Sequence, residues 1–285
     1  MDAAKAYIIR NMTPDEIGNI AVEWAALEGW NPGLHDAACF GAVDPNGFLV
    51  GLLNNQPIAC ISAVSYHSRF GFMGFYIVKP EYRGQGYGIK IWDAAIQYLK
   101  NQNIGLDGVV EQQDNYRKSG FKLAYSNIRY EGITQSLSAA FDGIVPLTPN
   151  LFEAVSNYDR LCFPEERSDF LRCWVQQPES YALVAAEQNE IKGYGVIRKC
   201  RNGYKIGPLF ANNAILADQL MLSLSDWAVP GERLYLDVPE PNPDAVQLAE
   251  KYSMKKVFGT ARMYTQQKPD IRLEKVFGVT SFELG

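Results

Sequence analysis

The chain has 285 residues, of which 47% are hydrophobic and 21% are charged. This length exceeds one ordinary domain core and suits two domains of roughly 140 residues each, which excludes a disordered chain or a minimal scaffold. The formal net charge is −5, and lysine and arginine are scattered among acidic residues, which argues against a nucleic-acid phosphate backbone as the main partner.

The first half is expected to begin with a short strand at 7–11 that leads into Thr13 and Pro14. A threonine hydroxyl can cap the free N–H groups of a helix start, and proline suits the first helical turn. The elements expected from this start onward are, in chain order, helices 14–28 and about 34–41, strands 48–53, 57–66 and 69–78, a helix 87–101, a strand 106–110, a helix 112–119 and a final strand 121–131.

The chain then repeats itself at a constant offset of 133 residues. Residues 48–66 align without gaps with residues 181–199, and each segment reads as an apolar strand, a polar turn and a second strand. The repeat also matches Arg129 with Arg262 near the end of each half. Because the order of elements agrees with these identities, we interpret the two domains as a duplication.

The second half is expected to follow the same order as the first. Its expected elements are a strand 143–147, helices 150–160 and 167–176, strands 181–186, 191–199 and 203–210, a helix from about 214 to 228, a strand 234–238, a helix 244–252, a strand 254–265 and one added strand within the tail 271–284. Strands interleaved with helices in this way predict an α+β (mixed α/β) fold, with helices on the faces of the sheet of each unit.

A glycine-rich loop, Arg83-Gly84-Gln85-Gly86-Tyr87-Gly88, lies directly between a predicted strand and a predicted helix. Its glycines allow a tight turn that leaves successive N–H groups uncovered at the positive end of the helix. Such a helix start binds anions, pyrophosphate included, without any net positive charge. The spacing matches neither the nucleoside triphosphatase loop nor the dinucleotide-binding fingerprint, and a purely structural turn is the alternative interpretation.

This loop resembles motif A of the GNAT superfamily of acetyl-CoA-dependent N-acetyltransferases. That motif is an Arg or Gln, two residues, a Gly, one residue and a Gly or Ala, and Arg83, Gly86 and Gly88 meet it in full. The resemblance implies that the strand before the loop splays from its neighbour and pairs with the pantetheine arm of CoA, while the loop amides bind the pyrophosphate. The residues that it assigns to the cofactor are Ile77 and Val78 for pantetheine and Arg83, Gly84, Gln85, Gly86, Tyr87 and Gly88 for pyrophosphate.

A second signature, Y-x-x-x-G-F beginning at Tyr116, also resembles this superfamily. The resemblance makes Tyr116 the general acid that protonates the departing CoA thiolate, a task that suits a phenol of ordinary pKa about 10. A helix tyrosine that merely packs beside CoA is the alternative. The family's Asn, seven residues before this Tyr, survives as Asn242 in the second unit but is Val109 in the first, so Asn115 is expected to replace it as a polar contact to CoA.

The resemblance leaves the general base open, because the family often places a Glu on the strand before the loop and GFMGFYIV contains none. Glu111 is the favoured candidate, and His67 and Glu28 are the others. An ordinary solvated charge is the alternative for each of them. Aromatic residues of the first helices are expected to shape the acceptor side of the site or to lie in the core: Trp24, Trp30 and Phe40.

The second unit is expected to bind no CoA. At the repeat offset, the glycine loop maps to residues 216–221, which contain no glycine and add Asp218, and Ala249 stands where the first unit has Tyr116. We therefore predict a catalytic, acetyl-CoA-binding GNAT domain at 1–133 and a divergent GNAT-like domain at 134–285. The resemblance, which extends to a bacterial tandem subgroup, implies a mixed, mostly antiparallel sheet with helices on both faces in each unit.

The activity that the resemblance implies is acetyl-CoA-dependent N-acetylation, in which a primary amine of a small molecule, protein or peptide attacks the thioester directly. Two alternatives stay open: a non-catalytic acyl-CoA sensor, and a transferase of longer acyl or aminoacyl groups. An aminoacyl transferase would need a basic face for tRNA, which disagrees with the acidic balance of the chain.

The cysteines and the remaining composition bear on metal binding and location. Five cysteines with no CxxC pair and only two histidines offer no zinc ligand set, so no metal is expected. We expect these cysteines to be buried or half-buried free thiols in a reducing compartment. No apolar run is long enough to span a membrane and no signal peptide is visible, so a soluble, cytoplasmic protein without a membrane partner is expected.

Overall fold

The structure, a computed structural model, describes residues 6–136, 140–188 and 190–285. The elements of its first half are β1 (Tyr7–Asn11), α1 (Pro14–Glu16), the π-helical η1 (Ile17–Val22), α2 (Glu23–Leu27), α3 (Asp36–Val43), β2 (Phe48–Leu53), β3 (Gln56–Tyr66), β4 (Phe70–Val78), η2 (Pro80–Tyr82), α4 (Tyr87–Tyr98), β5 (Asn103–Val109), η3 (Val110–Gln112), α5 (Gln113–Lys118) and β6 (Lys122–Ile133).

The second half repeats this order, as the sequence predicts. Its elements are β7 (Ile144–Pro146), η4 (Pro149–Leu151), α6 (Phe152–Asp159), α7 (Ser168–Trp174), β8 (Ser180–Glu187), β9 (Glu190–Lys199), β10 (Tyr204–Ala211), α8 (Ala214–Trp227), β11 (Arg233–Pro239), α9 (Pro243–Lys251), β12 (Lys255–Tyr264), η5 (Leu273–Lys275) and β13 (Val276–Gly278). The expected α+β fold of two similar units, with a mixed, mostly antiparallel sheet and helices, is confirmed, but the strands of both units form one sheet.

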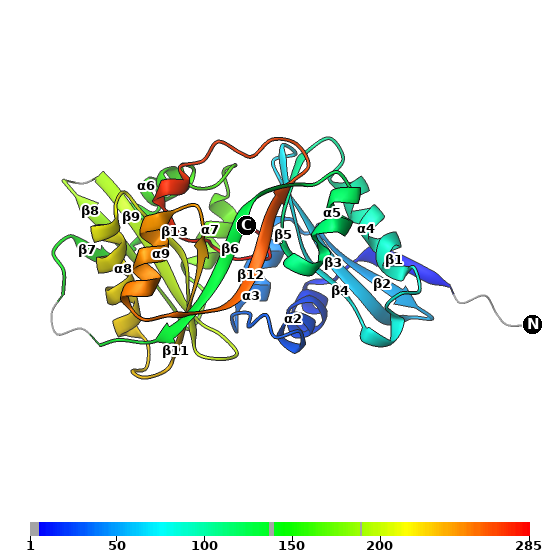
Figure 1. Ribbon diagram of the computed structural model, residues 1–285, viewed down its shortest axis with the longest axis horizontal. Coiled ribbons are helices and arrows are strands. Elements are labelled where there is room, and N and C mark those ends of the chain that lie inside the picture. The colour runs from blue at the N-terminus through cyan, green and yellow to red at the C-terminus, as the bar shows by residue number, and fades with distance from the viewer. Residues whose placement is uncertain (1–5, 137–139, 189) are drawn as a thin grey trace, which may run out of the picture.

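All strands of the described residues belong to one continuous sheet that runs through both units (Figure 1). Its order is β1-β2-β3-β4-β5-β12-β6-β11-β10-β9-β8-β7, with β13 paired to β10 beside this path. The last strands of the two units are therefore exchanged. β12 of the second unit pairs with β5 of the first, and β6 of the first unit pairs with β11 of the second. In Figure 1 the two exchanged strands, green β6 and orange β12, run side by side between the units.

Two buried ion pairs mark this exchange. Arg262 on β12 binds Asp107 on β5, with Nε and Nη2 donating at 2.9 and 2.6 Å. Arg129 on β6 binds Asp237 on β11 in the same way, at 2.6 and 2.7 Å. These four side chains are at most 5% exposed. The arginines that the repeat matches in sequence thus each neutralise an aspartate of the opposite unit.

Helices cover both faces of the sheet, and neighbouring side chains of β3 show how the faces differ. Cys60 and Val64 point into one core, in which helices of both units pack, whereas Ile61 points into a separate core beneath α4. In the shared core, the rings of Phe40 on α3 and Trp174 on α7 stack with centroids 5.8 Å apart. The two units are therefore joined both through the sheet and through one of its faces.

The cysteines correct one expectation. Cys39 of α3 and Cys173 of α7 form a disulfide with Cα atoms 5.3 Å apart, so these two are not free thiols. The other three are free and buried: Cys60, Cys162 and Cys200. The pairing joins residues that are 134 positions apart, which brings equivalent helices of the two units together. Among the described residues, no group of three or more His, Cys, Asp or Glu side chains is placed to hold a metal ion.

None of the helices in the described part of the chain combines the length and apolar character needed to cross a membrane.

Candidate active site

The first unit contains a gap between two parallel strands. β4 pairs with β5 from Phe70 to Met73, and the last of these pairs joins Met73 to Leu106. From Gly74 to Val78, β4 keeps its other neighbour β3 but has no partner on the β5 side. A bulge accompanies this change, since the pairing with β3 shifts register and Phe75 has a φ of +49°. The backbone of this stretch is thus free to pair with an extended ligand.

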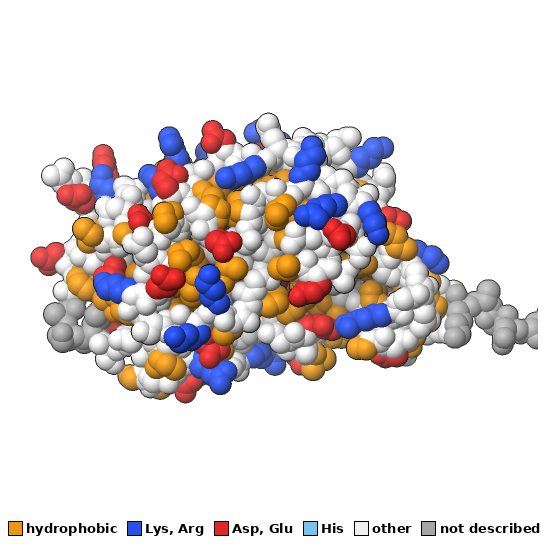
Figure 2. Space-filling view, in the orientation of Figure 1, with side chains coloured by type: hydrophobic (Ala, Val, Ile, Leu, Met, Phe, Trp, Pro, Cys, Tyr) orange, Lys and Arg blue, Asp and Glu red, His pale blue; other side chains and the backbone are white. Residues whose placement is uncertain are grey.

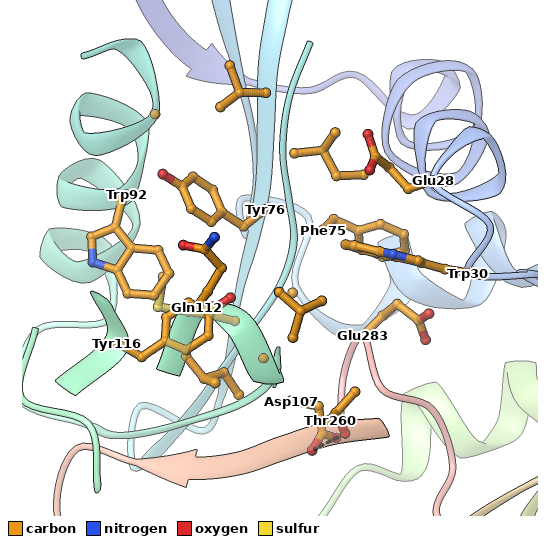
Figure 3. A pocket seen from close by; sticks show the side chains of 18 of the residues that line it. Glu28, Trp30, Phe75, Tyr76, Trp92, Asp107, Gln112, Tyr116, Thr260 and Glu283 are labelled. Atoms are coloured by element: carbon orange, nitrogen blue, oxygen red, sulfur yellow. Dashed lines mark hydrogen bonds between the residues drawn. The ribbon is translucent and has the colours of Figure 1, made fainter. Parts of the chain in front are cut away.

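A cavity of about 620 Å³ occupies this gap (Figure 3). Its walls come from β4, β5, the glycine loop, α4, α5, the end of α2 and Arg129 of β6, all in the first unit, and from β12 and the C-terminal segment of the second unit. In Figure 3, Trp92, Gln112 and Tyr116 lie on one side of the cavity, and Glu28, Trp30 and Glu283 lie on the other. The site is therefore built by both units.

The glycine loop ends at the start of α4, where no side chain caps the helix. Gly86 is the N-cap residue with a φ of +80°, a left-handed conformation that favours glycine. The N–H groups of the first turn lack partners within the helix and face the loop at the positive end of the helix dipole. This is the arrangement that an anionic group such as a pyrophosphate needs.

Arg83 lines the cavity and binds two other groups of the cavity wall. Its Nε donates to the carbonyl oxygen of Val78 at 2.7 Å, and its Nη2 donates to Glu28 at 2.5 Å. Val78 is one of the residues expected to pair with pantetheine, so Arg83 holds a backbone group of that stretch. A phosphate that attracts Arg83 would free both this carbonyl and Glu28.

The structure brings most of the predicted cofactor residues together. The predicted residues that line the cavity are Ile77, Val78, Arg83, Gly84, Gly86 and Gly88. Gln85 and Tyr87 belong to the same loop but do not line the cavity; the Gln85 amide donates to the carbonyl of Glu81. Asn115 is exposed outside the cavity, and its amide donates to Gln112 at 2.7 Å. Of these two polar residues, Gln112 lines the cavity and Asn115 does not.

Tyr116 lies in the wall of the cavity, and its ring stacks on Trp92 with centroids 5.6 Å apart. Burial raises the pKa of its hydroxyl to about 12, with Tyr76 and Glu111 adding to the increase. The phenol therefore keeps its proton at neutral pH, as a proton donor must. Tyr76 also lines the cavity, but its hydroxyl points towards Gly88 at the helix start.

The candidates for the general base lie in three different places. Glu111 is exposed in η3 and does not line the cavity. His67 binds Glu166 at 3.0 Å and lines a separate, smaller cavity of about 360 Å³. Glu28 does line the active-site cavity, where it pairs with Arg83. Only Glu28 of these three is therefore in reach of a reaction in the gap.

The aromatic residues expected on the acceptor side divide between the site and the core. Trp30 lines the cavity. Trp24 packs against the shared core with the Lys79 ammonium 5.1 Å from its ring, and Phe40 is fully buried between Phe75 and Trp174.

Several residues that line the cavity are not predicted from the sequence. Tyr76 could have been found, because side chains alternate along a strand and Tyr76 shares a face with Val78. Four further residues come from the second half of the chain, and no local signal connects them with the glycine loop; they are Thr260, Phe258, Phe282 and Glu283. Their position follows from the strand exchange and from the path of the C-terminal segment.

The equivalent gap of the second unit is filled by the chain itself. β10 pairs with β11 from Tyr204 to Ile206, and beyond this point β13 takes the open side of β10, with Leu209 opposite Gly278. Asn242, at the family's Asn position, donates to the carbonyl of Val276 at 2.9 Å and thereby holds this inserted segment.

The helix start of the second unit is also closed. The side chain of Asn213 caps α8 by accepting from the N–H of Leu216 at 3.0 Å. A ligand would have to displace both this cap and β13. These contacts support the prediction that the second unit binds no CoA.

Comparisons with known proteins agree with this geometry. The sequence model of the Acetyltransferase (GNAT) family matches residues 15–121, and that of the Acetyltransferase (GNAT) domain matches residues 155–278. Holothin acyltransferase of Pseudoalteromonas sp. (strain SANK 73390) is 31% identical over 266 residues, which cover 93% of this chain and 90% of that protein. YitH of Bacillus subtilis (strain 168), an uncharacterized N-acetyltransferase, is 23% identical over 80% of this chain and 81% of its own length.

Solved structures share the fold along almost the whole chain. A putative acetyltransferase of Pyrococcus horikoshii superposes with a TM-score of 0.82 at 22% identity and covers 98% of this chain and 96% of its own. A tandem GNAT protein from the clavulanic acid biosynthesis pathway superposes with a TM-score of 0.65 at 10% identity, over 92% of this chain and all of its own. With both halves matched and one relative similar over nearly its full length, the chain belongs to the GNAT acyltransferase family and consists of two GNAT units in tandem.

Proposed function

We propose that this protein is an acetyl-CoA-dependent N-acetyltransferase with a single active site in the first unit. The observation that carries the proposal is the continuity of the uncapped α4 start with the open edge of β4, along one cavity that ends beside Tyr116. A pyrophosphate at Gly84 and Gly86 and a pantetheine arm along Ile77 and Val78 would direct the thioester towards this phenol. The domain division at residues 133 and 134 remains part of the proposal.

The proposed reaction is a direct transfer. The nitrogen of a primary amine attacks the thioester carbonyl, the C–N bond forms, the C–S bond breaks, and Tyr116 gives its proton to the CoA sulfur. No cysteine lines the cavity among the described residues, so no covalent acyl-enzyme is proposed. On the face shown in Figure 2, basic and acidic side chains are interspersed, which gives no support to a tRNA-dependent aminoacyl transferase.

An acceptor screen tests this proposal. The protein is incubated with acetyl-CoA and a panel of primary amines that includes holothin, the acceptor in the name of the relative. CoA release is followed with a thiol reagent, and mass spectrometry identifies the acetylated amine. We expect turnover with at least one member and a preference for acetyl-CoA over butyryl- and octanoyl-CoA. Tight acetyl-CoA binding without turnover across the panel would favour the sensor, and a preference for octanoyl-CoA the longer-chain transferase.

Tyr116→Phe is expected to lower kcat by about a hundredfold to ten-thousandfold, the usual contribution of a general acid. The ring still packs on Trp92, so the affinity for acetyl-CoA should stay unchanged in calorimetry. The active form is the protonated phenol, which exists below its raised pKa of about 12 and is lost only as the pH rises through that value. The wild-type rate should therefore show no alkaline loss from this group up to about pH 10.5, whereas an ordinary tyrosine would already be half ionised near pH 10.

Tyr76→Phe is the matched variant, because it removes a second phenol from the same cavity. Its hydroxyl lies at Gly88, away from the expected thioester, so kcat should change by less than about fivefold, which corresponds to roughly 1 kcal/mol. If Tyr76→Phe costs more than Tyr116→Phe, the general acid is Tyr76. If neither substitution lowers kcat, neither Tyr116 nor Tyr76 is the acid.

A further inference from the structure

The C-terminal segment crosses from the second unit into the active site of the first. After β13, the N–H of Val279 donates to the carbonyl of Asp237 at 2.8 Å, which still holds the chain in the second unit. The hydroxyl of Tyr66, in β3 of the first unit, then donates to the carbonyl of Leu284 at 3.0 Å. Between these two anchors, the side chain of Glu283 reaches the cavity. The segment is thus fixed on both sides of Glu283.

Contact with β4 fixes where Glu283 lies along the gap. A Cβ atom at Gly74 would overlap the main-chain carbonyl oxygen of Glu283, so a glycine at this position is what allows the segment to approach. Gly74 is the first residue of β4 beyond the last pair with β5. Glu283 therefore lies at the point where the two strands separate. A pantetheine arm that runs along Val78 and Ile77 leads towards this point, where its thioester would lie.

The bonding of the cavity carboxylates singles out Glu283. Among the described residues, Glu28, Asp107 and Glu283 are the carboxylates that line the cavity. Glu28 is paired with Arg83, and Asp107 accepts two hydrogen bonds from Arg262. Glu283 is 5% exposed and makes no hydrogen bond or ion pair with the described part of the chain. It is the buried carboxylate with oxygens left for a ligand.

The charges around Glu283 come from three strands. Arg129 of β6, Arg198 of β9 and Lys205 of β10 all interact electrostatically with it. The two arginines are already paired, Arg129 with Asp237 and Arg198 with Asp36.

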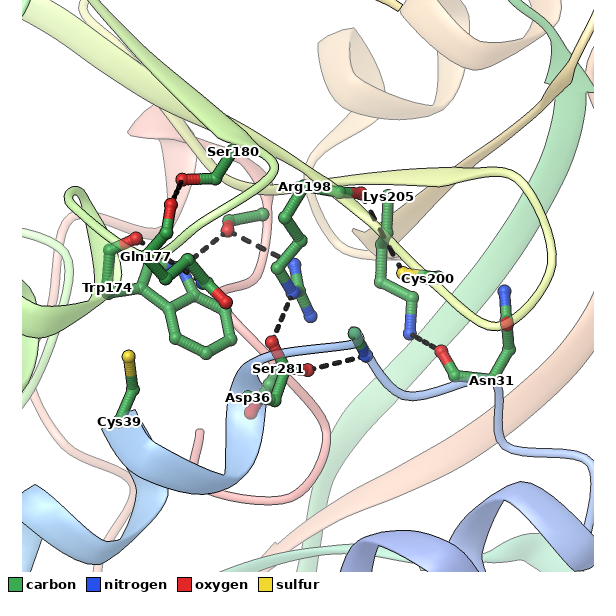
Figure 4. A network of polar contacts seen from close by, with 12 residues as sticks. Asn31, Asp36, Cys39, Trp174, Gln177, Ser180, Arg198, Cys200, Lys205 and Ser281 are labelled. Atoms are coloured by element: carbon green, nitrogen blue, oxygen red, sulfur yellow. Dashed lines mark hydrogen bonds and ion pairs between the residues drawn. The ribbon is translucent and has the colours of Figure 1, made fainter. Parts of the chain in front are cut away.

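Lys205 is the remaining cation of this group. Its ammonium donates to the carbonyl of Asn31 at 3.1 Å and forms no ion pair with a carboxylate of the described residues (Figure 4). Burial lowers the pKa of Lys205, with Arg129 contributing to the decrease and Glu283 opposing it. Asp237 and Asp36 thus pair with two of the three cations near Glu283, and Lys205 is the third.

We propose that Glu283 is the general base of the reaction and accepts a proton from the acceptor amine. This inference rests on the proposed N-acetyltransferase function. Figure 3 shows Glu283 and Tyr116 on opposite sides of the cavity, as a base and an acid must be when the thioester lies between them. β4 itself contains no Glu, and Glu283, which comes from a distant part of the chain, takes over that role.

Every proton that moves in this step has a donor and an acceptor. As the amine nitrogen bonds to the thioester carbonyl carbon, one N–H proton passes to the carboxylate of Glu283. The C–S electron pair leaves with sulfur, which takes the phenol proton of Tyr116. The products are the amide and the free thiol of CoA. Exchange with solvent then removes the proton from Glu283 and restores the one on Tyr116.

Glu283→Gln tests the assignment, because it keeps the shape of the side chain and removes its basicity. With the amine that the wild-type enzyme acetylates in the panel, kcat should fall by about a hundredfold to ten-thousandfold. Hydroxide can replace the missing carboxylate as the base, so the rate of the variant should rise more steeply with pH than that of the wild type, and its deficit should be smaller at pH 9.5 than at pH 7. Acetyl-CoA affinity should not change. The matched control is Glu274→Gln in η5, just before β13, because this side chain is 66% exposed and the variant should behave as wild type.

A second pair of variants separates a chemical role from a structural one. Glu283→Ala should regain activity when formate is added, since a small carboxylate can occupy the space, and Glu283→Asp should retain part of the rate with the wild-type pH profile. A side chain with a merely structural role would show neither response. These two variants also decide the question if Glu283→Gln does not fold.

The possible failures are distinguishable. If the wild-type protein acetylates no amine, the proposed function fails and Glu283 loses its role with it. If the wild-type protein is active and Glu283→Gln keeps both its kcat and its pH profile, only the assignment of Glu283 is overturned. An absence of formate rescue together with an unchanged pH profile in the Asp and Ala variants would overturn it as well.

Discussion

Gly86→Glu is expected to weaken acetyl-CoA binding by at least about a hundredfold, which is a loss of roughly 3 kcal/mol. Two effects combine at this position. The backbone has a φ of +80°, which costs a residue with a side chain about 1–2 kcal/mol. The new carboxylate also lies at the N-cap of α4. There it accepts hydrogen bonds from the N–H groups that a pyrophosphate needs, and its charge repels the phosphates. Isothermal titration calorimetry with acetyl-CoA measures the change.

Two variants separate these effects. Gly86→Asn introduces a side chain that tolerates a left-handed backbone and carries no charge, so its loss of affinity should be smaller than that of Gly86→Glu. Asn213→Asp adds a negative charge at the N-cap of α8, the equivalent position of the second unit, and should leave the affinity unchanged. Wild-type affinity in Gly86→Glu would place the pyrophosphate elsewhere. A loss in Asn213→Asp would show that α8 takes part in binding.

The structural features that could be predicted from the sequence are those that depend on residues close together in the chain. A strand followed by glycines and an amphipathic helix has few conformations available, and the structure places Gly84 and Gly86 at positive φ directly before α4. The position of the Tyr116 ring also depends on nearby residues, because the ring packs over Gly108 of β5, where a Cβ atom would overlap it. The order of the elements in each unit follows from hydrophobic periodicity in the same way.

The strand exchange could not be predicted, because the duplication makes two arrangements equally consistent with the sequence. Arg129 and Arg262 match each other, and so do Asp107 and Asp237. Each arginine could therefore neutralise the aspartate of its own unit or that of the other. An alternating strand specifies which side chains face a core but not which strand lies next to it. The placement of Glu283 depends on this same global choice, and so does the pairing of Cys39 with a cysteine of the other unit.

Separating the chain after residue 133 is expected to leave neither half folded. Alone, residues 1–133 would lack β12, whose Thr260–Tyr264 stretch pairs with β5, and residues 134–285 would lack β6, which pairs with all of β11. Each half would also bury an aspartate without its arginine, and breaking such a pair costs about 3–5 kcal/mol. Against a total stability of about 5–15 kcal/mol for a typical domain, this loss and the lost strand together exceed what either half can retain.

The measurement compares the two halves expressed separately with the same halves expressed together, one of them tagged. Separately, each should show no cooperative thermal transition and should bind a hydrophobic dye, whereas together they should co-purify in equal amounts and bind acetyl-CoA. Size-exclusion chromatography decides the remaining cases. A dimer of residues 1–133 would preserve the exchange between two copies, because Arg129 can replace Arg262 opposite Asp107. A folded, acetyl-CoA-binding monomer of residues 1–133 would instead mean that β6 can close its own sheet and that the exchange is not needed for folding.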